Sequence, residues 1–362
     1  MTRKSLGLAF LTILILAGCG RNPYDNPIAT NSQQPDKVLF DQSVDYIEKK
    51  RYDVARLQLQ TLINTYPDSE YIAKSKLAIA DSWYQQGGSS SLAQAEAEYD
   101  DFITFFPSME ESAEAQKRIC EIHYDQMVKP DRDNTHAIRA DQECRQLILQ
   151  WPNSIFRKET EQKLREVQEI IAEAEYRVGT YYTDKGSFRA GANRLQTLTE
   201  HYPLFSNSDD ALWQLGETYE SMGEEYTEQM VDAYTKIVRD YPLSAYVDAA
   251  KAKLTDLNRP IPTADPQRFE LHKYNVENRA YKGFWAKSFG IFGSAPDVRM
   301  AAKIGEPAST TLMPAIPPGI RGTTGVGVSQ PSADVGVQTI DGPGAIDTQP
   351  DARQNQPAAP QN

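Results

Sequence analysis

Pairs of an aromatic residue followed by proline recur along the middle of this chain. Their prolines are spaced 40, 45, 51 and 39 residues apart. Proline lacks an N–H donor and disfavours the helical conformation of the residue before it, so each pair predicts the end of a helix. A repeat of this length has room for two helices, and one helical hairpin cannot bury its apolar stripe alone. We therefore expect a stacked helical array. The five pairs are Tyr66-Pro67, Phe106-Pro107, Trp151-Pro152, Tyr202-Pro203 and Tyr241-Pro242.

Small and apolar residues return at matching positions within the repeats. Ala55, Ala95 and Ala140 each stand 12 residues before their proline, where two helices must approach closely. In the fourth repeat, the spacing of Gly179, Tyr182, Gly186, Phe188, Gly191 and Pro203 resembles the tetratricopeptide pattern. We predict an all-α fold, a right-handed α-solenoid of five tetratricopeptide-like hairpins over residues 37–257. First helices are expected at 37–49, 70–86, 110–127, 156–184 and 208–222, second helices at 53–66, 92–106, 135–151, 188–202 and 228–241, and a capping helix at 245–257.

The first 19 residues have the pattern of a bacterial lipoprotein signal. Arg3 and Lys4 precede an apolar run that is too short for a stable membrane span, and Leu-Ala-Gly-Cys follows. We expect a signal peptide over residues 1–18, Cys19 as the lipidated first residue of the mature chain, and a linker over 19–36. Gly20 stands where an aspartate would indicate retention in the inner membrane, which favours an outer-membrane anchor facing the periplasm. The alternative is an ordinary secretory signal with a coincidental cysteine.

Negative charge is concentrated in the predicted solenoid. The formal net charge is −12, and residues 20–258 carry −15 because the flanking segments together add +3. Such a body repels phosphates, so nucleic acid is an improbable partner. It is compatible with basic patches on a protein partner or with unfolded clients.

The composition changes after Asn258. Three prolines suggest a linker, and residues 258–292 continue as an aromatic and basic segment. Within it, Tyr281, Phe284, Trp285 and Phe289 have the spacing of an amphipathic helix, for which membrane-interface docking, partner docking or packing on the solenoid are open alternatives. Residues 293–362 are rich in Pro, Gly, Ala and Ser, so we expect a disordered tail that cannot bury enough apolar surface.

Together, the lipoprotein signal, the five repeats and an insert in the third repeat resemble the BamD family. The insert resembles the Asp-Arg-Asp-x-x-x-Ala turn of that family. It reads Lys129-Pro130-Asp131-Arg132-Asp133-Asn134-Thr135-His136-Ala137. The fourth repeat also resembles the fourth repeat of the family. The matching residues are Tyr181-Tyr182-Thr183-Asp184-Lys185-Gly186, followed by Asn193-Arg194. The resemblance covers roughly residues 19–257, and nothing is carried over to the remainder.

The resemblance implies an adaptor of the outer-membrane β-barrel assembly machinery. Such an adaptor docks to the POTRA region of a BamA-like barrel subunit and receives unfolded outer-membrane β-barrel precursors. Arg194, with Asn193, matches a family position implicated in communication with the barrel subunit. The alternative is that Arg194 is simply a solvent-exposed side chain beside the core positions of its helix. Tyr66 lies in the half that would take the precursor, and Tyr71 and Tyr84 are further client-binding candidates. Packing between repeats is the alternative for all three tyrosines.

Two cysteines fall on facing positions of the third hairpin. A disulfide between Cys120 and Cys144 is allowed in the oxidising periplasm, and two buried thiols acting as small apolar residues are the alternative. Asp131 and Asp133 lack the further ligands of a calcium loop, so a helix-capping turn is favoured.

No catalytic pattern stands out. The four histidines are scattered without metal spacing, and neither a phosphate loop nor a nucleophile elbow is found, so we expect no enzyme, no metal site and no cofactor beyond the lipid on Cys19. The alternative function is a periplasmic tetratricopeptide scaffold for cell-division or pilus-secretin assembly. An envelope hydrolase would require an active-site cluster that the sequence does not offer.

Overall fold

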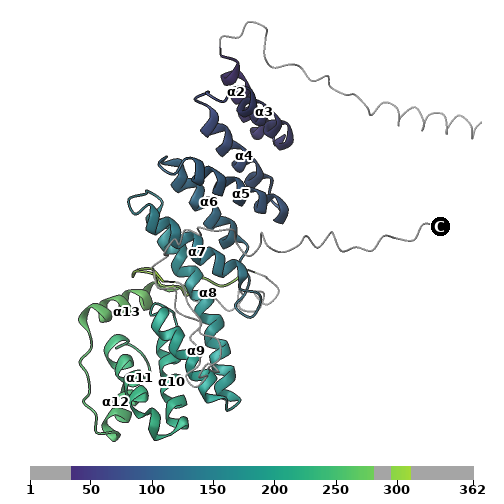
Figure 1. The fold of residues 1–362 in the computed structure, drawn as a ribbon. Coiled ribbons are helices and arrows are strands. Elements are labelled where there is room, and N and C mark those ends of the chain that lie inside the picture. Colours follow the sequence, from purple (N-terminus) through teal and green to yellow (C-terminus); the bar gives the residue numbers. More distant parts are fainter. Residues whose placement is uncertain (1–33, 281–294, 311–362) are drawn as a thin grey trace, which may run out of the picture. The chain divides into compact units, whose positions relative to one another are not determined.

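The computed structural model describes residues 34–280 and 295–310, which form helices and loops without any strand. Each helix from α2 to α12 packs on the next one along the chain, as stacked hairpins do (Figure 1). No helix of this described part is long and apolar enough to cross a membrane. The helices are α2 (Pro35–Glu48), α3 (Tyr52–Thr65), α4 (Ile72–Gln86), α5 (Ser89–Phe105), α6 (Glu111–Asp125), α7 (Thr135–Gln150), α8 (Arg157–Asp184), α9 (Phe188–His201), α10 (Ser208–Met222), η1 (Glu224–Tyr226), α11 (Thr227–Asp240), α12 (Val247–Asp256) and α13 (Pro266–Asn278).

The aromatic-proline pairs end the second helix of every hairpin, as predicted. The aromatic residue is the C-cap of α3, α5, α7, α9 and α11. Its main-chain N–H still donates to the carbonyl four residues earlier, as Tyr66 does to Leu62 at 2.9 Å. The following proline has no N–H to continue the ladder, so the helix stops there.

The small residues lie where the two helices of a hairpin cross. Ala55, Ala95 and Ala140 are fully buried. A Cβ added at Gly191 would lie 2.4 Å from Thr183 Cγ2, closer than real side chains approach. Since Gly191 is on α9 and Thr183 on α8, the glycine is what lets these two helices touch.

The core is continuous in one half of the solenoid and divided in the other. One cluster of buried apolar side chains runs from Met127 to Leu254, through α7 to α12. In the first repeats the buried residues form two separate clusters. One contains Ile47, Ala55, Leu59 and Ile79, and the other contains Ala80, Ala95, Tyr99, Phe102, Ala115, Ile119 and Ile122.

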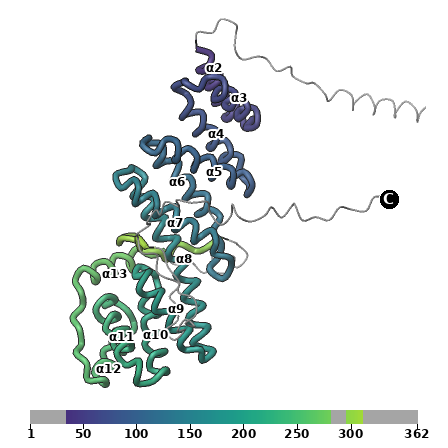
Figure 2. Tube along the Cα trace, in the orientation of Figure 1, coloured from purple at the N-terminus to yellow at the C-terminus, as the bar shows by residue number. Residues whose placement is uncertain are grey.

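Part of the chain beyond the capping helix is ordered. The segment 258–292, predicted as a linker and an aromatic-basic stretch, contains α13, whose first turn is capped because the Asp265 carboxylate accepts N–H bonds from Gln267 and Arg268. The disordered tail predicted from residue 293 does not hold for residues 295–310. This stretch, called the strap below, crosses α8 beside α13 (Figure 2), and Ala301 and Ala302 within it are buried.

Candidate functional site

Arg194 and a glutamate form an ion pair between α9 and α8. Arg194 Nη1 lies 2.8 Å from Glu175 Oε2, and the two side chains are 42% and 21% exposed. The pair exists because Gly179 lets the helices approach, since a Cβ added there would lie 2.9 Å from Leu195 Cγ. Arg194 is therefore held by its own chain and still reaches solvent. The neighbouring Asn193 accepts, through its carbonyl, a hydrogen bond from the Thr197 hydroxyl.

Apolar side chains lie exposed next to this ion pair. Val178 is 40% exposed and Tyr182 is 37% exposed. Glu175, Val178 and Tyr182 follow one another at i, i+3 and i+7 on α8, which places them on one side of the helix. We call Glu175, Val178, Tyr182 and Arg194 the α8–α9 face. Uncovered apolar groups beside an arginine are the composition that interfaces favour.

The structure does not bring the three candidate client-binding tyrosines together. Tyr66 caps α3. Tyr71 precedes α4 and packs on Phe40 of α2, with ring centroids 5.2 Å apart. Tyr84 lies near the other end of α4, roughly 20 Å along the helix axis. Its ring packs under the Arg118 guanidinium at 5.3 Å. All three are half-buried, and binding of a client to any of them stays a prediction.

Cys120 and Cys144 form a disulfide that joins α6 to α7. Their Cα atoms are 4.9 Å apart, both residues are fully buried, and Leu164 of α8 packs on them. In the insert before α7, the Asp133 carboxylate accepts hydrogen bonds from the main-chain N–H and the hydroxyl of Thr135, so it closes the turn. Among the described residues, no group of three or more metal-ligating side chains gathers into a site.

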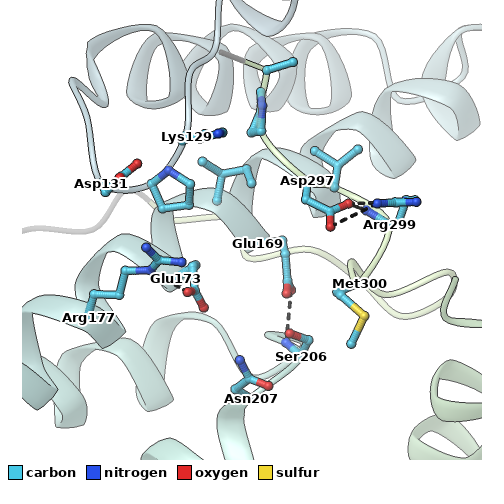
Figure 3. Close-up of a pocket in the computed structure, with 15 residues that line it drawn as sticks. Lys129, Asp131, Glu169, Glu173, Arg177, Ser206, Asn207, Asp297, Arg299 and Met300 are labelled. Atoms are coloured by element: carbon cyan, nitrogen blue, oxygen red, sulfur yellow. Dashed lines mark hydrogen bonds and ion pairs between the residues drawn. The ribbon is translucent and has the colours of Figure 1, made fainter. Parts of the chain in front are cut away.

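A cavity of about 600 Å³ lies between the insert, α8, the α9–α10 loop and the strap (Figure 3). Glu169 forms its floor and accepts a hydrogen bond from the main-chain N–H of Ser206 at 3.0 Å. Burial raises the pKa of the Glu169 carboxyl to about 7, although the hydrogen bonds from Ser206 and the charge of Arg279 oppose the shift. The sequence does not indicate this site, because a single glutamate within a glutamate-rich helix carries no signal of burial.

Some predicted positions lie outside the described residues. These are Cys19 with the signal peptide, and the aromatic positions Tyr281, Phe284, Trp285 and Phe289.

Comparison with known proteins gives one family and several relatives. Residues 32–233 match the model of the YfiO family, described as an outer membrane lipoprotein. The outer membrane protein assembly factor BamD of Caulobacter vibrioides is 24% identical over 217 residues, which cover 59% of this chain and 69% of that protein. The protein of the same name from Xylella fastidiosa (strain 9a5c) is 23% identical over 235 residues, covering 60% and 76%. That of Rickettsia prowazekii is 22% identical over 220 residues, covering 61% and 85%.

The family match and the described structure end at different places. The match stops within α11, so α12, α13 and the strap lie beyond it. Both helices that carry the α8–α9 face lie inside it.

Proposed function

This chain belongs to the YfiO family of outer membrane lipoproteins, whose relatives are named BamD, and on that premise we propose that it is an adaptor of the outer-membrane β-barrel assembly machinery. It docks to the POTRA region of a BamA-like barrel subunit and receives unfolded outer-membrane β-barrel precursors. Lipid on Cys19 anchors it to the outer membrane, facing the periplasm. The role is binding rather than catalysis, and it requires no cofactor.

The observation that carries the docking proposal is the α8–α9 face. Arg194 is half-exposed and already positioned by Glu175, so a partner carboxylate can approach it without ordering the side chain first. Val178 and Tyr182 beside it supply apolar area that gains free energy when a partner excludes water from it. The barrel subunit would therefore sit over the second half of α8 and over α9.

Reception of the precursor is assigned to the first two repeats. Their half-buried tyrosines lie at separate junctions between helices, so a client would meet several small aromatic contacts instead of one deep groove. Such spaced contacts suit an extended chain, whose side chains alternate along its length. This assignment rests on the family resemblance and on the exposure of Tyr66, Tyr71 and Tyr84.

The test is recovery of the partner from the cell envelope. The tagged full-length lipoprotein is extracted in mild detergent, and bound proteins are identified and quantified by mass spectrometry. We expect a stoichiometric POTRA-bearing barrel protein with the wild type and at least a tenfold lower yield with Arg194→Glu. Recovery of a secretin or of division proteins without that barrel would contradict the proposal and favour the scaffold alternative.

A matched control separates docking from loss of the internal ion pair. Arg157→Glu reverses a charge of nearly equal exposure, 43%, which pairs with Glu161 on the same helix at 2.8 Å, and it should leave the yield unchanged. The double variant Arg194→Glu with Glu175→Arg restores an internal pair but reverses the charge offered to the partner. If the double variant recovers the barrel subunit fully, Arg194 acts only within its own chain.

A further inference from the structure

The cavity beside the middle of α8 has the size of a small-molecule site. Its volume is about 600 Å³, and ligand pockets in proteins usually measure several hundred Å³ (Figure 3). Glu169, Glu173 and Arg177 line it from α8, where steps of four residues place them on one side of the helix. The α8–α9 face uses roughly the opposite side of α8, so the cavity is not part of the proposed docking surface.

Most of the charges that line the cavity are paired with each other. Arg177 Nε lies 2.6 Å from Glu173 Oε1, and Arg299 Nε lies 2.8 Å from Asp297 Oδ1. When Glu169 is ionised, the lining carries a formal net charge of −1. The charged lining residues are Asp131, Glu169, Glu173, Asp297, Lys129, Arg177 and Arg299.

Glu169 is the buried acid of this set. It is 6% exposed, and its carboxylate accepts the main-chain N–H of Ser206 at 3.0 Å. Arg279, which follows α13, donates to the Ser206 carbonyl at 3.2 Å. Burial raises the pKa of the Glu169 carboxyl to about 7 although Ser206 and the charge of Arg279 act in the opposite direction. The ionised carboxylate is therefore only partly compensated, and a cation beside it would stabilise it.

The rest of the lining favours an organic cation over a metal ion. Among the described residues, no group of three or more metal-ligating side chains gathers here or elsewhere, so a metal ion would lack protein ligands. Apolar side chains also line the cavity, among them Pro130, Ile170, Val298 and Met300. An aliphatic stem packs on such side chains while its charged head bonds an acid, as lysine and arginine side chains do.

We propose that this cavity binds a small organic cation, an aliphatic chain whose ammonium or guanidinium head pairs with the Glu169 carboxylate. The chain packs against Ile170 and Val298. The site goes beyond the adaptor role, because none of its residues belongs to the α8–α9 face. The strap residues that line it lie outside the family match.

Such binding must become tighter as pH rises through the pKa of Glu169. With that pKa at about 7, the ionised fraction of the carboxyl rises from about one-tenth at pH 6 to about nine-tenths at pH 8. A cation that needs the ionised form therefore gains about tenfold in affinity, whereas an anion that needs the protonated form loses about tenfold. The other charged groups around Glu169 are Glu173 and Arg177 of α8, Lys129 and Asp131 of the insert, Asp297 and Arg299 of the strap, and Arg279 after α13.

The experiment titrates agmatine into the untagged full-length chain by isothermal calorimetry at pH 6 and pH 8. Agmatine is an aliphatic chain with a guanidinium at one end and an ammonium at the other, and both stay protonated over this range. We expect about tenfold tighter binding at pH 8. Glu169→Gln should weaken binding at pH 8 about tenfold or more and should remove its dependence on pH. Glu161→Gln changes a carboxyl of the same helix that pairs with Arg157 away from the cavity, and it should bind as the wild type.

Two further measurements keep the outcome decisive. Glutarate, a dicarboxylate of similar length, is the matched anion and should not bind at pH 8. Ala295→Trp narrows the cavity from an exposed position and should weaken agmatine binding even if Glu169→Gln alters the fold, which circular dichroism would reveal. The proposal is overturned if agmatine does not bind at pH 8, if it binds equally at both pH values, or if it binds folded Glu169→Gln as it binds the wild type. Tighter binding of glutarate than of agmatine would overturn it too, by assigning the cavity to an anion.

Discussion

The first two repeats and the last two repeats are built from the same hairpin but are held together differently. In the first two, α2 to α5 contact only near neighbours along the chain, and their buried apolar residues form separate clusters. In the last two, one core cluster reaches from α7 to α12, and α13 and the strap join segments far apart in sequence. Among the described residues, the same repeat therefore yields a half whose helices contact mainly their neighbours along the chain and a half that also bonds distant segments.

This difference predicts which part of the solenoid unfolds locally first. In a solenoid, stability is approximately the sum of each repeat and its interfaces with neighbours. A repeat that contacts only the adjacent repeats unfolds locally at a lower free energy than a repeat that also contacts distant parts of the chain. We expect the first two repeats to exchange and unfold before the last two, which would suit a half that accommodates varied clients.

The largest expected effect comes from the same core truncation made in each half. Leu59→Ala and Leu195→Ala both remove a fully buried side chain, and each should cost about 2–5 kcal/mol. Leu59→Ala should speed hydrogen exchange of α2 to α4 only, whereas Leu195→Ala should speed it from α7 to α12. Exchange followed by mass spectrometry resolves these segments. Equal acceleration along the whole chain with either variant would mean that the two halves are one cooperative unit.

Removal of the disulfide should have the next largest effect. Cys120 and Cys144 are 24 residues apart. Closing a loop of that length stabilises the folded state by about 3 kcal/mol in the chain-entropy model. The double variant Cys120→Ala with Cys144→Ala keeps apolar groups in the core, so its lower urea midpoint would report the cross-link. Treatment with a reductant should move the wild type to the midpoint of the variant, and unchanged midpoints would show that α6 and α7 need no cross-link.

Glu169 should make the stability of the second half depend on pH. Its pKa, about 7 in the folded protein, is above the ordinary value near 4.5, so its favourable contribution is complete below pH 4.5 and is lost as pH rises through 7. Glu169→Gln should therefore be more stable than the wild type at pH 8, by on the order of 2–3 kcal/mol, and equal to it near pH 4.5. Urea unfolding of both chains across this range measures the difference.

A neighbouring glutamate provides the control for that titration. Glu173 also lines the cavity, but it pairs with Arg177 on the same helix at 2.6 Å and is partly exposed. Glu173→Gln should change stability by less than about 1 kcal/mol at any pH, since surface pairs contribute little. If the unfolding free energy of Glu169→Gln depends on pH as steeply as that of the wild type, the Glu169 carboxyl does not cause the pH dependence.

The smallest expected effect on stability is at Arg194. Its ion pair with Glu175 is partly exposed to solvent and carries little net energy, so Arg194→Ala should cost less than about 1 kcal/mol of unfolding free energy. A small loss of stability together with a large loss of barrel-subunit recovery would assign this residue to docking. A loss comparable to that of Leu195→Ala would instead make it part of the framework.

The helices were predictable because their ends carry local signals. Each aromatic-proline pair lies at the C-cap where the sequence indicates it, and Ala55, Ala95 and Ala140 are buried at the crossings. Periodicity of this kind depends only on residues within one repeat, and it repeats five times.

The sequence does not predict the strap and α13 as it predicts the repeats, and the reason differs between the two. For α13 the sequence holds two competing signals: Asp265 followed by Pro266 is a strong start to a helix, whereas the prolines nearby indicate a linker. The strap has no such signal. Its buried residues are alanines, and its partners on α8 lie 140 positions away in sequence, so no local pattern predicts that it docks.

The continuity of α8 has a mechanical consequence. The helix has 28 residues and no proline, so it behaves as one stiff rod about 42 Å long. The strap grips it near Arg165, roughly 12 Å from its start and 28 Å from its end. A rod pivoting at that grip would have unequal arms. A displacement of its start, at the disulfide-bonded third repeat, would be more than doubled at its far end near Asp184, and would be only slightly enlarged at Glu175, which pairs with Arg194 about 15 Å beyond Arg165.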